Sequence, residues 1–236
     1  ATTEIYTLSL HDALPISFSV AVLIGGDSSR MGSDKATFQV DGVAMANRVA
    51  AAAAEAGAAE ILMIGGTQAR AKNLSGAWKK DAFPGEGPLG GVITALKAAE
   101  HDTVVVLSCD MPFITAAVIN SLVRGLADAQ ATVGRTDRLN WLCAAWSKEE
   151  CLKPLQGVWK RNERAVHRAA VLLDVVEVPV RNEQSTNLVL TFFEVACVRQ
   201  NVVDTRCVAF AKAKAASGVE KAKALAAAIS QIDEEL

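Results

Sequence analysis

A glycine-containing loop near the start of the chain carries the residue types that bind a triphosphate. Residues 23–35 read LIGGDSSRMGSDK. Glycines let the backbone approach a ligand closely, and successive loop N–H groups can form a nest for an anion. Arg30 and Lys35 add two positive charges to the same loop. These features favour a phosphate site over the alternative, a tight turn with two solvated cations, although the spacing is not that of a Walker A loop.

A carboxylate follows an apolar run further along the chain. Asp110 and the preceding Cys109 come directly after TVVVLS at 103–108. Mg²⁺ is bound in proteins by one or two carboxylates together with substrate phosphates. Asp110 is therefore a candidate ligand of Mg²⁺. The alternative is that it caps a helix opening at Pro112.

Short apolar runs alternate with helix-forming segments, and this alternation must position those residues. Continuously apolar strands predict an α/β fold with a mostly parallel sheet and helices on both faces. Ligands of such sheets bind beyond the carboxyl ends of the strands, and three of these ends carry Gly25-Gly26, Gly65-Gly66 and Cys109-Asp110. We expect strands at 18–24, 60–64, 103–107, 142–146 and 175–180, the last at an edge, and helices at 44–59, 89–100, 114–127, 158–173, 209–216 and 219–233.

Composition limits the class of protein. The 236 residues include 24 basic and 26 acidic side chains, a net charge of −2, which argues against a nucleic-acid partner bound through bulk charge. No apolar run is long enough to predict a membrane span. The five cysteines form no CxxC pair and are expected to be reduced thiols in the cytoplasm. Residues 1–17 read as a non-native or disordered leader, and 18–236 as a single domain with a helical C-terminal end.

Three blocks of the sequence resemble one family in order and spacing. They are the loop at 23–35, the segment 81–91 (DAFPGEGPLGG) and the strand that runs into CDMP at 109–112. Together they are similar to the molybdenum cofactor guanylyltransferases of the nucleotidyltransferase superfamily. The resemblance implies a Rossmann-like nucleotidyltransferase fold, a twisted sheet with helices on both faces.

The resemblance also implies an activity and a set of site residues. The expected reaction is a Mg²⁺-dependent transfer of GMP from GTP to molybdenum-bearing molybdopterin, with release of pyrophosphate and transient contact with cofactor-receiving enzymes. Catalysis is expected to use Arg30, Lys35 and Asp110, with Asp110 on the metal. The nucleotide is expected to contact Leu23, Ile24, Gly25, Gly26, Arg30, Lys35, Asp81 and Asp110.

The acceptor end departs from the family pattern. The family's Asn-x-(Asp/Asn)-Thr-Pro segment has its nearest match at 201–206 (NVVDTR), with one extra residue and Arg206 in place of proline. Asn201 and Asp204 are the candidate acceptor contacts. We interpret Trp141 as a packing residue and His167 as part of a solvated basic face; the alternative for both is contact with the acceptor. Two other functions stay open, a related cytidylyl or other NTP transferase with another phosphorylated acceptor, and a non-catalytic nucleotide-binding or partner-binding module.

Overall fold

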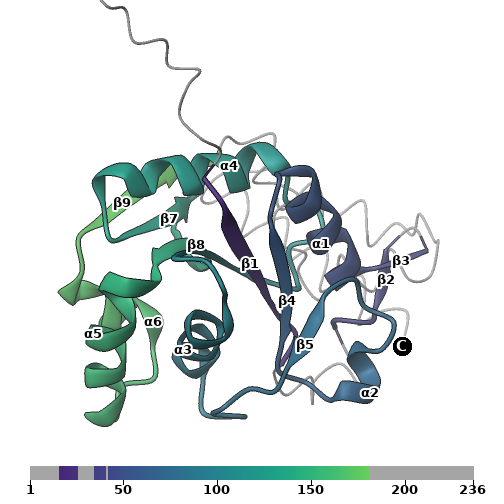
Figure 1. Ribbon diagram of the computed structural model, residues 1–236, viewed down its shortest axis with the longest axis horizontal. Helices are drawn as coiled ribbons and strands as arrows, with labels where there is room; N and C mark the ends of the chain where they lie inside the picture. The colour runs from purple at the N-terminus through teal and green to yellow at the C-terminus, as the bar shows by residue number, and fades with distance from the viewer. Residues whose placement is uncertain (1–15, 26–34, 41, 181–236) are drawn as a thin grey trace, which may run out of the picture.

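A seven-stranded sheet forms the centre of the molecule (Figure 1). The computed structural model describes residues 16–25, 35–40 and 42–180. The strand order is β5-β4-β1-β6-β8-β7-β9, and a two-stranded ribbon, β2-β3, accompanies the sheet. The strands span Phe18–Leu23 (β1), Gln39–Val40 (β2), Val43–Ala44 (β3), Glu60–Ile64 (β4), Ala77–Lys79 (β5), Thr103–Ser108 (β6), Ala131–Arg135 (β7), Leu139–Ser147 (β8) and Val175–Pro179 (β9).

The predicted mostly parallel sheet is confirmed. All six residues of β1 are buried, and this strand pairs in parallel with β4 on one side and β6 on the other. Strands β4 and β5, and β7 and β9, are also parallel. Only β8 runs against its neighbours β6 and β7, so the sheet is mixed at that position. As its proline indicated, β9 lies at an edge.

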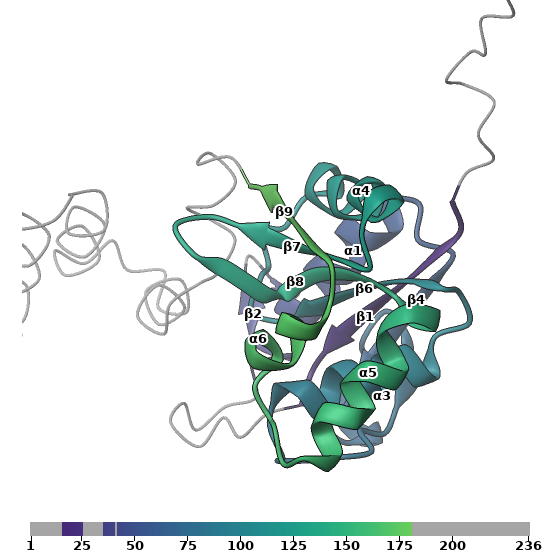
Figure 2. The same ribbon diagram turned by 90° about the vertical axis from the view of Figure 1, so that its left-hand side faces the viewer.

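Helices cover both faces of the sheet, as expected for this fold class (Figures 1 and 2). Helices α1 (Met45–Glu55) and α4 (Ala116–Gly125) lie on one face. Helices α3 (Pro88–Ala98), α5 (Lys148–Lys160) and α6 (Val166–Ala169) lie on the other. A short α2 spans Gln68–Ala71, and 3-10 turns span Leu126–Asp128 and Ala170–Leu172.

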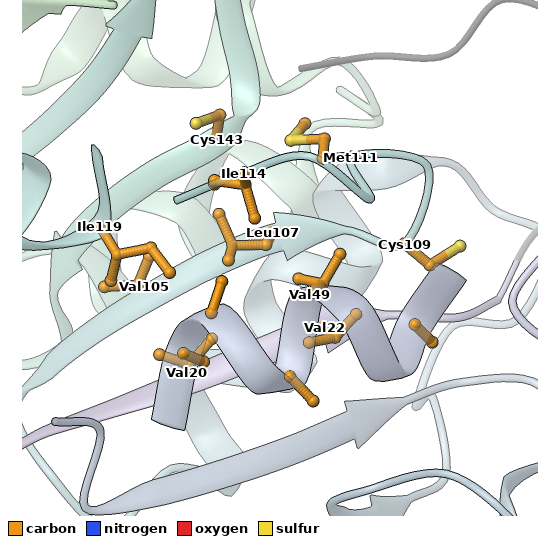
Figure 3. Packing of buried hydrophobic residues seen from close by; sticks show 14 of the residues in the cluster. Val20, Val22, Val49, Val105, Leu107, Cys109, Met111, Ile114, Ile119 and Cys143 are labelled. Carbon is orange, nitrogen blue, oxygen red and sulfur yellow. The ribbon is translucent and has the colours of Figure 1, made fainter. Parts of the chain in front are cut away.

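Each face has its own apolar core, because the alternating side chains of the buried strands point to opposite sides. Val20, Val22, Val105 and Leu107 point toward α1 and α4, where Val49 packs against them (Figure 3). The opposite side chains of the same strands, together with α3 and α5, form the second core. In the part of the chain that the structure describes, no helix is long and apolar enough to cross a membrane.

One predicted helix was wrong in its extent. The segment 158–173 was expected to be a single helix, but α5 begins at Lys148 and ends at Lys160, and α6 starts only at Val166. The break follows from Asn162, whose φ of 70° is incompatible with a continuing right-handed helix. Strands β2, β3, β5 and β7 were missed. The expectations for the leader and for the helices at 209–216 and 219–233 fall largely or wholly outside the described residues.

Candidate functional site

A cleft of about 380 Å³ opens at the carboxyl ends of β1, β4 and β6, the edge at which the strand ends were predicted to converge. The backbone holds these ends together: Ile24 N donates to Ile64 O at 2.9 Å, and Cys109 N donates to Leu23 O at 3.2 Å. The walls are formed by Leu23, Ile24, Gly25, Lys35, Ile64, Asp81, Gly85, Gly87, Pro88, Gly91, Ser108, Cys109, Asp110 and Leu142.

Six of the predicted site residues therefore share one cleft: Leu23, Ile24, Gly25, Lys35, Asp81 and Asp110. The other four, Gly26, Arg30, Asn201 and Asp204, lie outside the described residues. Bringing Lys35 and the two carboxylates together from three separate segments makes a cleft with both signs of charge. The role of each residue stays a prediction.

Asp110 is not a helix cap. It lies in the turn beyond β6, whereas α4 begins at Ala116 with Thr115 as its cap, whose hydroxyl accepts from Val118 N. The capping alternative is thus wrong, and the carboxylate is left on the cleft wall. Among the described residues, no group of three or more His, Cys, Asp or Glu side chains is arranged to hold a metal ion. Mg²⁺ bound by a single protein carboxylate commonly completes its coordination with substrate oxygens and waters.

Asp81 is held in place by the backbone just before α3 and by Thr94 in the middle of that helix. Its Oδ1 accepts from Phe83 N and from the Thr94 hydroxyl, both at 2.9 Å. The same hydroxyl accepts from Ala82 N at 3.2 Å and also lies 2.9 Å from Gly90 O. Thr94 is buried, so this network fixes the direction in which the Asp81 carboxylate faces the cleft. The sequence did not single out Thr94; a hydroxyl in the apolar run of α3 was its only signal.

Gly65 allows the chain after β4 to approach the chain after β1 closely. Its φ is 90°, and a Cβ built there would lie 3.0 Å from both N and Cα of Gly25. The Gly65 carbonyl accepts from Trp78 Nε1 at 2.8 Å, and its N–H donates to Lys79 O at 3.0 Å. Gly65 is therefore a packing element of the strand ends, and it keeps Gly25 on the cleft wall.

The segment 85–91, part of the second block that carries the family resemblance, contributes a wall of the cleft. It contains a literal GxGxxG that directly follows no strand and so lacks the Rossmann context, and a turn at residues 82–86 leads into it. Gly85 and Gly87 have φ of 77° and 101°, and Pro88 is the first residue of α3. The turn and the N-terminus of α3 thus face the cleft, a placement suited to an anion.

A second hollow, of about 410 Å³, adjoins the cleft and shares Pro88 and Leu142 with it. Trp141 and His167, interpreted from sequence as packing and solvated residues, both line this hollow. Trp141 is half-buried, with its ring centroid 6.4 Å from that of Trp146. The complete lining is Pro88, Asn140, Trp141, Leu142, Arg164, Ala165, Val166, His167 and Arg168.

One ion pair beside the second hollow, Glu163 with Arg168, shifts the pKa of its carboxyl group. Hydrogen bonds from Arg168, at 2.6 and 2.8 Å, and from the backbone N–H groups of Ala165 and Arg164 lower the pKa of Glu163 to about 2.

Burial raises the pKa of the Cys143 and Cys151 thiols to about 12. These two thiols stay protonated near neutral pH and are unsuited to act as nucleophiles.

Comparison with known proteins agrees with this architecture. The sequence model of one family, described as "MobA-like NTP transferase domain", matches residues 20–175. A probable molybdenum cofactor guanylyltransferase of Clostridium perfringens is 34% identical over 132 residues, 55% of this chain and 66% of that protein. The chain thus spans just under two thirds of that relative. The molybdenum cofactor guanylyltransferase of Pseudomonas entomophila is 30% identical over 187 residues, 75% of this chain and 96% of that protein.

The fold itself is found among solved structures. Molybdopterin-guanine dinucleotide biosynthesis protein A from Archaeoglobus fulgidus superimposes with a TM-score of 0.61, covering 78% of this chain and 97% of that one. Its sequence is only 21% identical, so the likeness shows the shared fold. The predicted Rossmann-like nucleotidyltransferase fold is confirmed.

Proposed function

Because this chain belongs to the family of MobA-like NTP transferase domains, a family of nucleotidyltransferases, we propose that it transfers GMP from GTP to a phosphorylated acceptor, molybdenum-bearing molybdopterin. The observation that carries the proposal is the cleft, whose lining brings Lys35, Asp81 and Asp110 together with several glycines. The names of the relatives support the choice of base and acceptor.

Each group of cleft residues has its own role in such a transfer. Lys35, with Arg30 of the same loop, neutralises the triphosphate and the departing pyrophosphate. The backbone at Leu23, Ile24 and Gly25, continuing into Gly26, holds the nucleotide against the strand ends. Asp81, fixed by Thr94, contacts the nucleotide from the opposite wall.

Asp110 fits a hard cation, because a carboxylate oxygen on the wall of a phosphate-binding cleft is the ligand that Mg²⁺ takes beside substrate oxygens. When bound there, Mg²⁺ supplies neutralisation of phosphate charge. The protein positions the reactants: an oxygen of the acceptor phosphate forms a bond to the α-phosphorus of GTP, the bond to the β-phosphate oxygen breaks, and pyrophosphate leaves. No protein nucleophile takes part.

The acceptor is assigned to the second hollow. Its shared wall with the cleft, at Pro88 and Leu142, would place a bound acceptor next to the triphosphate. Trp141 offers an aromatic face, and the exposed Arg168 and His167 offer hydrogen-bond donors for an anionic group. Asn201 and Asp204 stay the candidate acceptor contacts from the later part of the chain, and cofactor-receiving enzymes stay the expected transient partners.

Thermal unfolding with Mg²⁺ plus GTP, CTP, ATP or UTP tests the nucleotide assignment. A ligand at 100 times its Kd adds about 2.7 kcal/mol to the free energy of unfolding, a rise in Tm of about 5–10 °C in a domain of this size. We expect the rise with GTP to be lost in Lys35→Ala and kept in Lys153→Ala, a lysine on the exposed side of α5. A rise with CTP alone would identify a cytidylyl enzyme, and no rise with any nucleotide would favour the non-catalytic module.

The rate of pyrophosphate release tests whether Asp110 binds the metal ion. With GTP and the acceptor present, Asp110→Ala is expected to abolish pyrophosphate release while the folded protein keeps its unfolding temperature. Pyrophosphate release at the wild-type rate in Asp110→Ala would overturn the role of this carboxylate.

A further inference from the structure

Arg164 does not line the nucleotide cleft, yet it contacts the glycine turn that does and the helix residue that follows this turn. Its Nη2 lies 3.3 Å from Glu86 Oε2. Its carbonyl oxygen accepts from Leu89 N at 3.3 Å. A Cβ added to Gly87 would meet both Cβ and O of Arg164 at 3.4 Å. Arg164 therefore contacts Glu86 through its side chain and Leu89 through its backbone, and it lies close beside Gly87.

Arg164 is itself fixed by the end of α5. Its guanidinium lies over the Trp159 ring, 3.8 Å from the centroid. Nη1 donates to Trp159 O at 3.1 Å and to Glu163 O at 3.0 Å, and Nη2 donates to Asn162 Oδ1 at 3.1 Å. A planar guanidinium held by a ring face and several carbonyl-type oxygens has little rotamer freedom left to lose.

The ring beneath Arg164 supports the other end of the same segment. The Trp159 centroid is 4.4 Å from that of Phe83, and a Cβ added to Gly90 would lie 3.1 Å from the Trp159 ring. Phe83 in turn donates its N–H to Asp81. The stack of Arg164, Trp159 and Phe83 thus braces the cleft wall from Asp81 to the start of α3.

We propose that Arg164 is a positioning residue for nucleotide binding, which holds the exposed turn 85–88 in the conformation that faces the cleft. A turn with two glycines at positive φ has many other conformations available, and ordering it only when the ligand arrives would weaken the affinity. The inference rests on the proposed function, since it concerns the affinity for the nucleotide in that cleft.

The test is a double-mutant cycle on the Kd for GTP in the presence of Mg²⁺, measured by calorimetry. Removing an exposed ion pair and a cation–π contact, each about 0.5–1 kcal/mol, corresponds to a Kd weakened by about 5- to 30-fold in Arg164→Ala. Glu86→Gln alone should weaken binding about 2- to 5-fold. Added to Arg164→Ala, it should cause no further loss, because its partner is already gone. Arg161→Ala, an exposed arginine three positions earlier, should stay within about twofold of the wild type.

Two readouts separate positioning from general damage to the fold. Arg164→Lys keeps a cation near Glu86 but loses the planar stack, so its Kd should fall between those of the wild type and Arg164→Ala. A merely structural role would reduce the fraction of molecules that bind GTP, seen as a lower stoichiometry, and leave the Kd of the remainder unchanged. That result, or an unchanged Kd in Arg164→Ala, would overturn the inference alone. A wild-type protein that binds no GTP would instead overturn the proposed function and the inference with it.

Discussion

The close approach of Gly65 to Gly25 makes one substitution unusually informative. Gly65→Ala adds a methyl group at a φ of 90°, 3.0 Å from backbone atoms that cannot turn away. Positive φ costs an alanine about 1–2 kcal/mol of folding free energy. Forcing the neighbouring backbone aside adds about 1–3 kcal/mol, as overpacking commonly does. We therefore expect Gly65→Ala to lower the free energy of unfolding by about 2–5 kcal/mol.

Gly57 provides the matched control, because its φ of 87° is nearly the same and a Cβ added there has nothing within 4 Å. Gly57→Ala should show the conformational cost without the clash. Urea unfolding of both variants measures the difference, and each kcal/mol corresponds to about 2–4 °C in Tm for a domain of this size. Equal losses in the two variants would refute the argument that contact with Gly25, and not backbone conformation alone, requires glycine at position 65.

Two further perturbations follow from the same structure. Thr94→Val removes the hydroxyl that joins Ala82 N and Asp81 Oδ1 and should cost about 1–3 kcal/mol in urea unfolding, whereas Thr94→Ser should cost less; equal losses would contradict the role of the hydroxyl. Because Glu163 has a pKa of about 2 in the folded protein against 4.5 ordinarily, its stabilising effect is complete above that ordinary value and is lost as the pH falls toward 2. The urea midpoints of the wild type and Glu163→Gln should therefore differ at pH 6, and the difference should shrink below pH 4.5 and vanish only as the pH falls through about 2; a constant difference would argue against the pair with Arg168.

The central strands were predictable because they are buried on both faces. β1, β4 and β6 are short runs made mainly of apolar side chains, and such runs have few alternatives in a chain with helix-forming segments between them. β5 and β7 gave no such signal. β5 is three residues long at an edge, and β7 contains Gly134 beside a register shift. These strands are determined by pairing with neighbours distant in the sequence, which a local pattern does not contain.

The site residues also divide into those that a local sequence pattern reveals and those that only distant contacts reveal. Gly25, Lys35 and Asp110 could be brought together from sequence because each follows, directly or within a loop, the end of a recognisable strand. Thr94 and Arg164 could not, since their importance lies in contacts with Asp81 and Glu86 made across the fold. The end of α5 was missed because a left-handed residue, Asn162, interrupts a segment of otherwise helical composition.

Because β8 runs antiparallel to its neighbours, the second hollow is lined by residues from the start of a strand, whereas the cleft is lined mainly by residues that follow strand ends. The cleft is built mainly where β1, β4 and β6 finish, whereas Asn140 and Trp141 reach the same rim from the beginning of β8. The β7–β8 hairpin can thus accumulate sequence changes without altering the loops that follow the parallel strands. Under the proposed assignment of the acceptor to the second hollow, changes at Asn140 and Trp141 would reshape the acceptor wall alone, whereas a change at Leu142 would alter both hollows.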